Sequence, residues 1–174
     1  LRTGDYFNVQ MCYHDIPERL NPFDYETFDK NPSKGYAVVT NIETGLAEYL
    51  PMKNMHRNID AVRASASMPL VSRPVEINGK LYLDGGLADS IPLLHAVTDG
   101  CRKNVVVMTK ETGYRRVQPK HLELIKARYA KYPKVYELMA NRAAAYNQQL
   151  DYLEAEVKNG TAFLIQPSHP NEVG

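Results

Sequence analysis

The pattern of apolar and polar positions predicts a first hairpin between residues 35 and 50. Residues 35–42 hold a short apolar run that is typical of a buried strand. The following Glu-Thr-Gly supplies a turn, because Gly45 adopts a positive φ without steric cost. Residues 46–50 then return as a second strand.

The first 34 residues carry a weaker pattern. Residues 6–13 alternate between polar and apolar side chains and predict a strand, with apolar positions at Phe7, Val9 and Met11. Residues 21–34 are rich in Pro, Asp and Asn and predict a loop. This region therefore adds one strand to the expected sheet.

A short helix and a second hairpin follow. Asn58 or Asp60 can cap a helix that runs to Ser67 and is ended by Pro69. Residues 74–77 and 80–83 then flank an Asn-Gly pair. Asn-Gly is a strong signal for a two-residue turn, because both central residues of that turn need a positive φ.

Helix and strand alternate after the second hairpin. Asp89, Ser90 and Pro92 mark the start of a helix that ends near Gly100, with Asp89 as the expected cap. Residues 104–109 contain an all-apolar run, which is typical of a parallel strand covered on both faces. This rhythm predicts an α/β fold.

The last third of the chain is predicted to be mainly helical. One helix is expected over residues 119–132 and a longer one over residues 134–159, followed by a strand at 162–165. The longer helix carries one apolar stripe, formed by Tyr136, Met139, Ala143, Tyr146, Leu150, Leu153 and Val157. The stripe is interpreted as core, and a face that contacts lipid is the alternative.

Composition and charge change this picture little. Two cysteines, Cys12 and Cys101, without a ladder of spacings predict a reducing compartment and a cytoplasmic location. The net charge of +1 gives no general reason to expect nucleic-acid binding. Residues 115–142 nevertheless hold eight basic and two acidic side chains. A solvated helix face is the expected explanation, and peripheral docking to a membrane surface is the alternative.

The strongest chemical signal is Asp84-Gly85-Gly86, which lies between a predicted strand and a predicted helix. A carboxylate followed by two residues without side chains lets a substrate or a partner hydroxyl approach closely. Strand ends of α/β sheets are also where ligands gather. From spacing alone, a turn aspartate whose oxygens accept backbone N–H groups is the expected explanation, because turn aspartates far outnumber catalytic ones.

The surrounding residues resemble the patatin-like phospholipase family, in particular its bacterial members. The similarity rests on Arg-Ala-Ser-Ala-Ser-Met-Pro at residues 63–69, on the hairpin after it, and on Asp-Gly-Gly-Leu-Ala-Asp-Ser-Ile-Pro at residues 84–92. Motif-level similarity extends from Tyr36 to Thr109 and returns near Phe163.

The resemblance implies a three-layer α/β/α sandwich, of which this chain is a portion with a helical C-terminal extension. It also implies hydrolysis of lipid or phospholipid acyl esters by a Ser–Asp dyad. Asp84 would be the catalytic aspartate, with Gly85 and Gly86 shaping the edge of the site. No cofactor, metal or catalytic histidine is implied.

The sequence departs from the family where the nucleophile is expected. It contains no Gly-x-Ser-x-Gly elbow and no Gly-rich oxyanion loop. Ser65 and Ser67 lie on a helix without flanking glycines and are not expected to replace the nucleophile. The chain alone is therefore expected to be inactive. A non-catalytic binding or scaffold module derived from the same fold is the alternative.

Structural roles are expected for the histidines and for Asp89, which was named above as a helix cap. The five histidines have no metal-ligand spacing and are scattered over the sequence, at positions His14, His56, His95, His121 and His169. His95 could formally serve in a triad, but a position on a helix surface is the expected one.

The chain is expected to be one partial domain over residues 1–174. The sheet and the Asp-Gly-Gly site fall in 1–110, the helical segment in 115–160, and the last strand and tail in 161–174. A strand such as that at 104–109 needs sheet neighbours and covering helices, so a missing N-terminal half would leave apolar faces open. The expected partners are thus an acyl-ester substrate and either a second copy of the chain or its missing half, with no specific nucleic acid.

Overall fold

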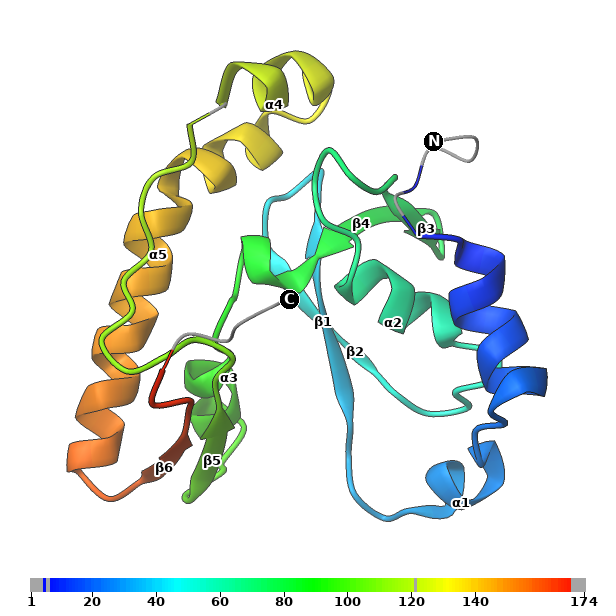
Figure 1. Ribbon diagram of the computed structural model, residues 1–174, viewed down its shortest axis with the longest axis horizontal. Helices are drawn as coiled ribbons and strands as arrows, with labels where there is room; N and C mark the ends of the chain where they lie inside the picture. The colour runs from blue at the N-terminus through cyan, green and yellow to red at the C-terminus, as the bar shows by residue number, and fades with distance from the viewer. Residues whose placement is uncertain (1–4, 6, 121, 170–174) are drawn as a thin grey trace. The chain divides into compact units, whose positions relative to one another are not determined.

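The computed structural model describes residues 5, 7–120 and 122–169, which form two compact units. Unit 1 comprises Leu1–Asp89 and His121–Met139, and unit 2 comprises Ser90–Lys120 and Ala140–Gly174. Both units combine helices and strands, so the predicted α/β class and the helical C-terminal region are confirmed (Figure 1).

Unit 1 is built on a four-stranded antiparallel sheet. Its strands lie in the order β2 (Ala47–Pro51), β1 (Tyr36–Asn41), β4 (Lys80–Asp84) and β3 (Val75–Ile77). The two predicted hairpins are β1–β2 and β3–β4. Gly45 has φ +73°, and Asn78 and Gly79 have φ +52° and +76°, as the turn chemistry requires.

Successive side chains of β4 point to opposite faces of this sheet, and each face has its own core. Tyr82 packs with Val39 and Val75 beside α2 (Ile59–Ser65), which contacts β1, β3 and β4 (Figure 1). Leu83 joins a second cluster with side chains from α4 (Leu122–Arg128) and from the start of α5 (Pro133–Lys158); its buried members are Ile42, Leu83, Leu87, Ile125, Tyr129, Val135 and Met139.

The N-terminal prediction is wrong over its described residues. Tyr6 lies outside them, and from Val9 the chain is helical, continuing as a π-helix, η1 (Met11–Leu20). The side chain of Asn8 accepts the N–H of Met11 at 3.1 Å, and Arg19 pairs with Asp15 at helical spacing. No residue of η1 is buried, so its weak alternation had no sheet to join.

The predicted loop at residues 21–34 contains a short helix, α1 (Tyr25–Lys30). Asp24 caps it by accepting the N–H of Thr27 at 2.9 Å. That backbone hydrogen bond, together with one from the Thr27 side chain, lowers the pKa of the Asp24 carboxyl. A cap of this kind turns an Asp-rich stretch into a helix start.

Unit 2 holds a two-stranded parallel sheet of β5 (Asn104–Val107) and β6 (Ala162–Ile165). Both strands were predicted, and their pairing with each other was not. Its core joins side chains of α3 (Leu93–Thr98), of α5 and of the sheet; the buried members are Ile91, Leu93, Tyr146, Leu153 and Ala162.

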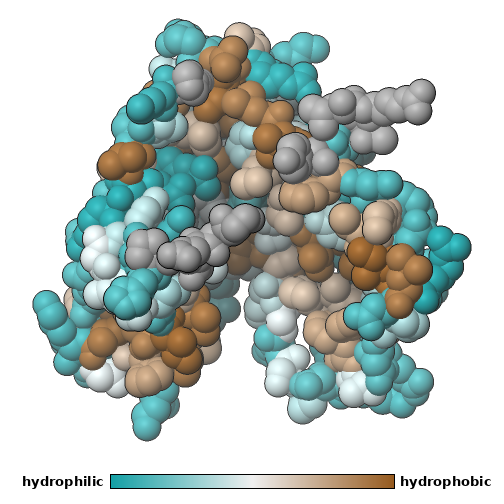
Figure 2. Space-filling model, viewed as in Figure 1, coloured by the Kyte–Doolittle hydropathy of each residue, from teal (hydrophilic) through white to brown (hydrophobic). Residues whose placement is uncertain are grey.

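The expectation that β5 is covered on both faces is wrong. Val106 and Leu164 pack onto the core, whereas the alternate side chains are exposed: Val105 by 66%, Val107 by 69%, Phe163 by 65% and Ile165 by 48%. Figure 2 shows hydrophobic side chains gathered over these two strands. Helices of the described residues cover one face of this sheet, and we call the other its bare face.

The predicted stripe on α5 is largely confirmed as core. Met139, Ala143, Tyr146 and Leu153 are buried, and Val135 joins them. The helix ends before Gly160, which has φ +73°. The preceding helix α4 is shorter than the 119–132 predicted for it.

Candidate active site

Asp84 is the last residue of β4, and backbone hydrogen bonds fix its main chain on both sides. Its N–H donates to the carbonyl of Ser67 at 2.8 Å, and its own carbonyl accepts the Thr40 hydroxyl at 2.8 Å. Ser67 follows α2 and Thr40 lies on β1, so two neighbouring elements hold this single residue in place.

The carboxylate of Asp84 is held through one oxygen. Oδ1 accepts the N–H of Gly86 at 2.7 Å and so caps the 3₁₀ turn η2 (Gly85–Leu87). Oδ2 accepts no hydrogen bond from the described part of the chain, and the residue is half-buried. The arrangement combines a turn aspartate with one oxygen that remains able to accept a proton.

A side chain at position 85 would collide with the backbone of β1, so this position requires glycine. A Cβ at this position would lie 2.2 Å from the carbonyl oxygen of Val38, which is backbone and cannot move aside cheaply. The N–H of Gly86 holds Asp84, a contact that any residue other than proline could make. Gly85 thus lets the turn after Asp84 lie directly on β1.

Thr40 is a residue of this site that the sequence analysis missed. It is fully buried on β1, beside the turn after Asp84. Its hydroxyl donates to the Asp84 carbonyl and accepts the N–H of Ala88 at 3.2 Å. The available signal was a polar residue at the end of an otherwise apolar strand.

Ser65 and Ser67 do not lie in an exposed turn. Ser67 is buried, and its hydroxyl donates to the carbonyl of Arg63 at 2.7 Å. Its contribution to the site is the carbonyl that accepts the N–H of Asp84. Ser65 is the last residue of α2 and is half-buried.

Asp89 does not act as the predicted helix cap. The N-cap position of α3 is Pro92, without a side-chain cap. The N–H groups of Ser90 and Ile91 donate to the Gln149 side chain. Asp89 accepts the hydroxyl of Tyr49 at 2.5 Å, and this hydrogen bond links Asp89 to β2.

Three of the histidines lie beside acidic side chains. His14 and His56 both approach Glu18, and His95 lies 3.4 Å from Asp99 on the next turn of α3. His121 lies outside the described residues. No group of three potential metal ligands occurs among the residues that the structure describes.

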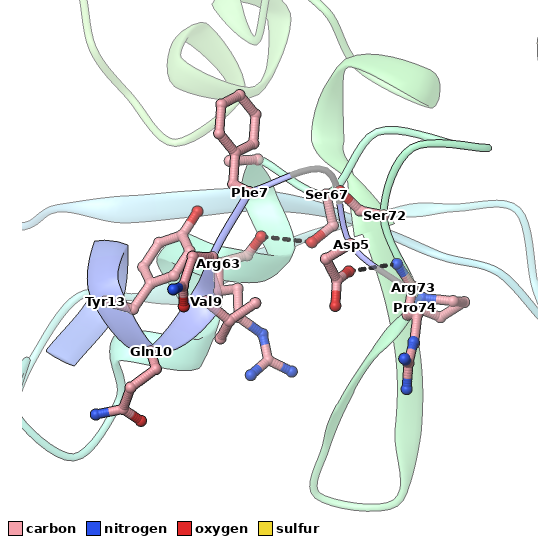
Figure 3. Close-up of a pocket in the computed structure, with 12 residues that line it drawn as sticks. Asp5, Phe7, Val9, Gln10, Tyr13, Arg63, Ser67, Ser72, Arg73 and Pro74 are labelled. Atoms are coloured by element: carbon pink, nitrogen blue, oxygen red, sulfur yellow. Dashed lines mark hydrogen bonds between the residues drawn. The ribbon is translucent and has the colours of Figure 1, made fainter. Parts of the chain in front are cut away.

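Ser67 is one of the residues that line a cavity of about 420 Å³ (Figure 3). The N-terminal segment, α2 and the loop after it form its walls, with Asp5, Tyr13, Arg63 and Arg73 among the lining residues. Asp5 accepts the N–H of Arg73 at 2.8 Å (Figure 3). Asp84 does not line this cavity. Ser67 connects the two, because it lines the cavity and its carbonyl accepts the N–H of Asp84.

A cross-strand network stabilises the same sheet away from Asp84. Glu48 accepts hydrogen bonds from Asn41 and Tyr82, each at 2.8 Å, and from Lys80 at 3.2 Å. Burial raises the pKa of Glu48, but these hydrogen bonds outweigh it and hold that pKa below its usual range. Burial and the Glu48 carboxylate together raise the pKa of Tyr82 to about 12.

The family model for patatin-like phospholipase matches residues 4–97, which is more than half of the chain and includes every residue of the Asp84 site. The chain belongs to the patatin-like phospholipase family. Residues 132–174 match a second model, a domain of unknown function, DUF6363. The patatin-like match therefore ends within α3, and α5 lies wholly within the second matched segment.

Among curated proteins, the patatin-like chain is similar to the uncharacterized protein YjjU of Escherichia coli (strain K12). The two are 39% identical over 62 residues, which is 35% of this chain and 17% of that protein. The aligned part thus spans less than a fifth of its relative.

The basic segment of this patatin-like chain is partly paired. Arg115 contacts Asp151 and Glu154, and Lys134 contacts Glu137. Lys126 lies over the Tyr136 ring at 5.6 Å from its centroid. The contacts of Lys126 and Lys134 fit the solvated helix face expected for the segment, whereas Arg115 lies in irregular structure before α4. No helix among the described residues is both long and apolar enough to cross a bilayer.

Proposed function

We propose that the complete protein to which this chain belongs hydrolyses acyl esters of lipids with a Ser–Asp dyad, and that Asp84 is the general base. The observation that carries the proposal is the geometry of Asp84. Its main chain and one carboxylate oxygen are held by hydrogen bonds, while Oδ2 accepts none from the described residues. Membership of the patatin-like phospholipase family supports a lipid substrate.

The chemistry needs a fixed base. A serine hydroxyl becomes an effective nucleophile when a neighbouring group accepts its proton. A carboxylate oxygen in direct contact can accept that proton and later return it to the leaving alcohol. Asp84 Oδ2 is the atom assigned to this task, and the anchoring of Oδ1 limits rotation of the carboxylate.

This chain supplies the base and lacks the nucleophile elbow, since no Gly-x-Ser-x-Gly occurs in its 174 residues. We therefore expect the purified chain to have no esterase activity. Turnover of a short-chain nitrophenyl ester above the rate of buffer alone would contradict this. Peripheral membrane contact and association with a second copy or with a missing half remain predictions.

The test of the dyad is Asp84→Asn in the complete protein. The amide cannot accept the serine proton, so kcat is expected to fall by about 10²–10⁴-fold with folding unchanged. Asp99→Asn is the matched control, because Asp99 is exposed at the end of α3 and is expected to keep full activity. Unchanged kcat in a folded Asp84→Asn protein would overturn the assignment.

The hydrogen bond from Gly86 to Asp84 would also stabilise a purely structural turn. This observation supports a second candidate function, a non-catalytic binding module. The two candidates differ in a sequence feature. A Gly-x-Ser-x-Gly elbow upstream in the complete protein supports the enzyme, and its absence supports the binding module.

A further inference from the structure

The Thr40 hydroxyl bridges the two ends of the turn that carries Asp84. It donates to the Asp84 carbonyl at 2.8 Å, just before the turn, and accepts the N–H of Ala88 at 3.2 Å, just after it. Thr40 itself is 0% exposed and lies on β1, paired with Leu83 of β4. One buried side chain thus satisfies a donor and an acceptor of the same loop.

We propose that Thr40 is a positioning residue for the Asp84 carboxylate. The inference rests on the proposed function, in which Asp84 is the base. The peptide unit between Asp84 and Gly85 is planar, so fixing its carbonyl also fixes the direction in which the chain continues. The next donor along the chain is the N–H of Gly86, which holds Asp84 Oδ1 at 2.7 Å. The Thr40 hydroxyl therefore controls the orientation of the carboxylate through two successive contacts.

Packing alone does not require a hydroxyl at this position. Valine has nearly the same shape and is equally suited to a strand, and the neighbouring Val39 and Ile42 are apolar and fully buried. The hydrogen bonds to the turn, which include a longer contact with the Gly85 carbonyl at 3.5 Å, are what threonine adds. The close approach of Gly85 to Val38 places the same turn against the same strand, so β1 is the support on which the site is built.

The proposal predicts a specific kinetic pattern in the complete protein. Thr40→Val removes the hydroxyl and keeps the shape, so kcat is expected to fall about 10–100-fold while KM changes by less than about twofold. Thr40→Ser restores the hydroxyl and is expected to keep kcat within about threefold of the original protein. Thr44→Val makes the same change in the exposed β1–β2 turn and is the matched control.

The outcomes separate the two proposals. Unchanged kcat in Thr40→Val, with Asp84→Asn inactive, overturns the positioning role and leaves the dyad intact. Activity in Asp84→Asn overturns the dyad itself. Equal losses in Thr40→Val and Thr40→Ser also overturn the positioning role, because they indicate a packing defect. If Thr40→Val does not fold, Thr40→Cys takes its place in the same comparison, since a thiol has a similar size and is a weak donor.

Discussion

The antiparallel sheet of unit 1 and the parallel sheet of unit 2 differ in how completely their faces are covered. In unit 1, Tyr82 and Leu83 are consecutive on β4, and both are buried, each in a different cluster. In unit 2, Val106 packs onto the core while Val105 and Val107 are exposed. Parallel sheets in proteins are normally covered on both faces. The sheet that carries Asp84 is thus covered on both faces at β4, whereas the bare face of unit 2 is not covered by its described residues.

The largest effect is expected from truncating one core leucine in each unit. Leu83→Ala and Leu153→Ala each remove a side chain that is almost fully buried, and each is expected to cost about 2–5 kcal/mol of unfolding free energy. Amide hydrogen exchange on this chain measures where protection is lost. Loss confined to the mutated unit indicates separate stability, and loss in both units from either change would contradict that separation.

A smaller, pH-dependent effect is expected from the Glu48 network, which has no counterpart across β5 and β6 among the described residues. Glu48→Gln is expected to cost about 1 kcal/mol near neutral pH, because it removes the charge that strengthens three hydrogen bonds. The pKa of Glu48 is lowered by folding, so this stabilisation is present above the pKa of the unfolded chain and disappears as the pH falls through the lower, folded value.

Urea unfolding between about pH 7 and pH 3 measures the contribution of the Glu48 carboxylate to the free energy of unfolding. The difference between the original chain and Glu48→Gln should shrink toward the acid end. Glu76→Gln on β3 is the control, because Glu76 is exposed. A constant difference at every pH would contradict the assigned role of the carboxylate.

The smallest effect is expected on the bare face. Val107→Thr keeps a β-branched side chain at an exposed position and is expected to change the unfolding free energy by less than about 0.5 kcal/mol. Val106→Thr makes the same change one residue away, where the side chain packs onto the core, and is expected to cost about 1–3 kcal/mol. Equal costs at the two positions would show that the two faces do not differ in burial.

Local signals predicted most of the strands. The Asn78-Gly79 turn and Gly45 define both hairpins because positive φ leaves few residue choices. The run at residues 104–109 was placed correctly as a parallel strand, but its burial was not, since burial depends on what covers the sheet. The N-terminal helices were missed because apolar alternation suggested a strand at residues 6–13 and a Pro-, Asp- and Asn-rich composition suggested a loop at 21–34. Asn8 and Asp24 instead start helices through side-chain hydrogen bonds.

The site was predictable only in part. Asp84, Gly85 and Gly86 are contiguous, and a motif made of neighbours is visible in sequence. Thr40 lies 44 positions earlier and Tyr49 lies 40 positions before Asp89, so their contacts arise from the pairing of β1 with β4 and β2. Asp89 illustrates the limit, because its neighbours suggested a cap while its hydrogen-bond partner comes from another strand.

The path of α5 has a consequence for how the chain can be divided. The helix has 26 residues, about 39 Å of continuous backbone, and belongs to the segment matched by the second family model. Its first turns nevertheless place Val135 and Met139 in the core beside Leu83, one residue before Asp84. Removing the second matched segment would therefore remove Val135 and Met139 from the cluster that contains Leu83. The matched segments and the packed cores thus do not share a boundary in this protein, and an exchange of the C-terminal segment between relatives would have to preserve those two helical positions.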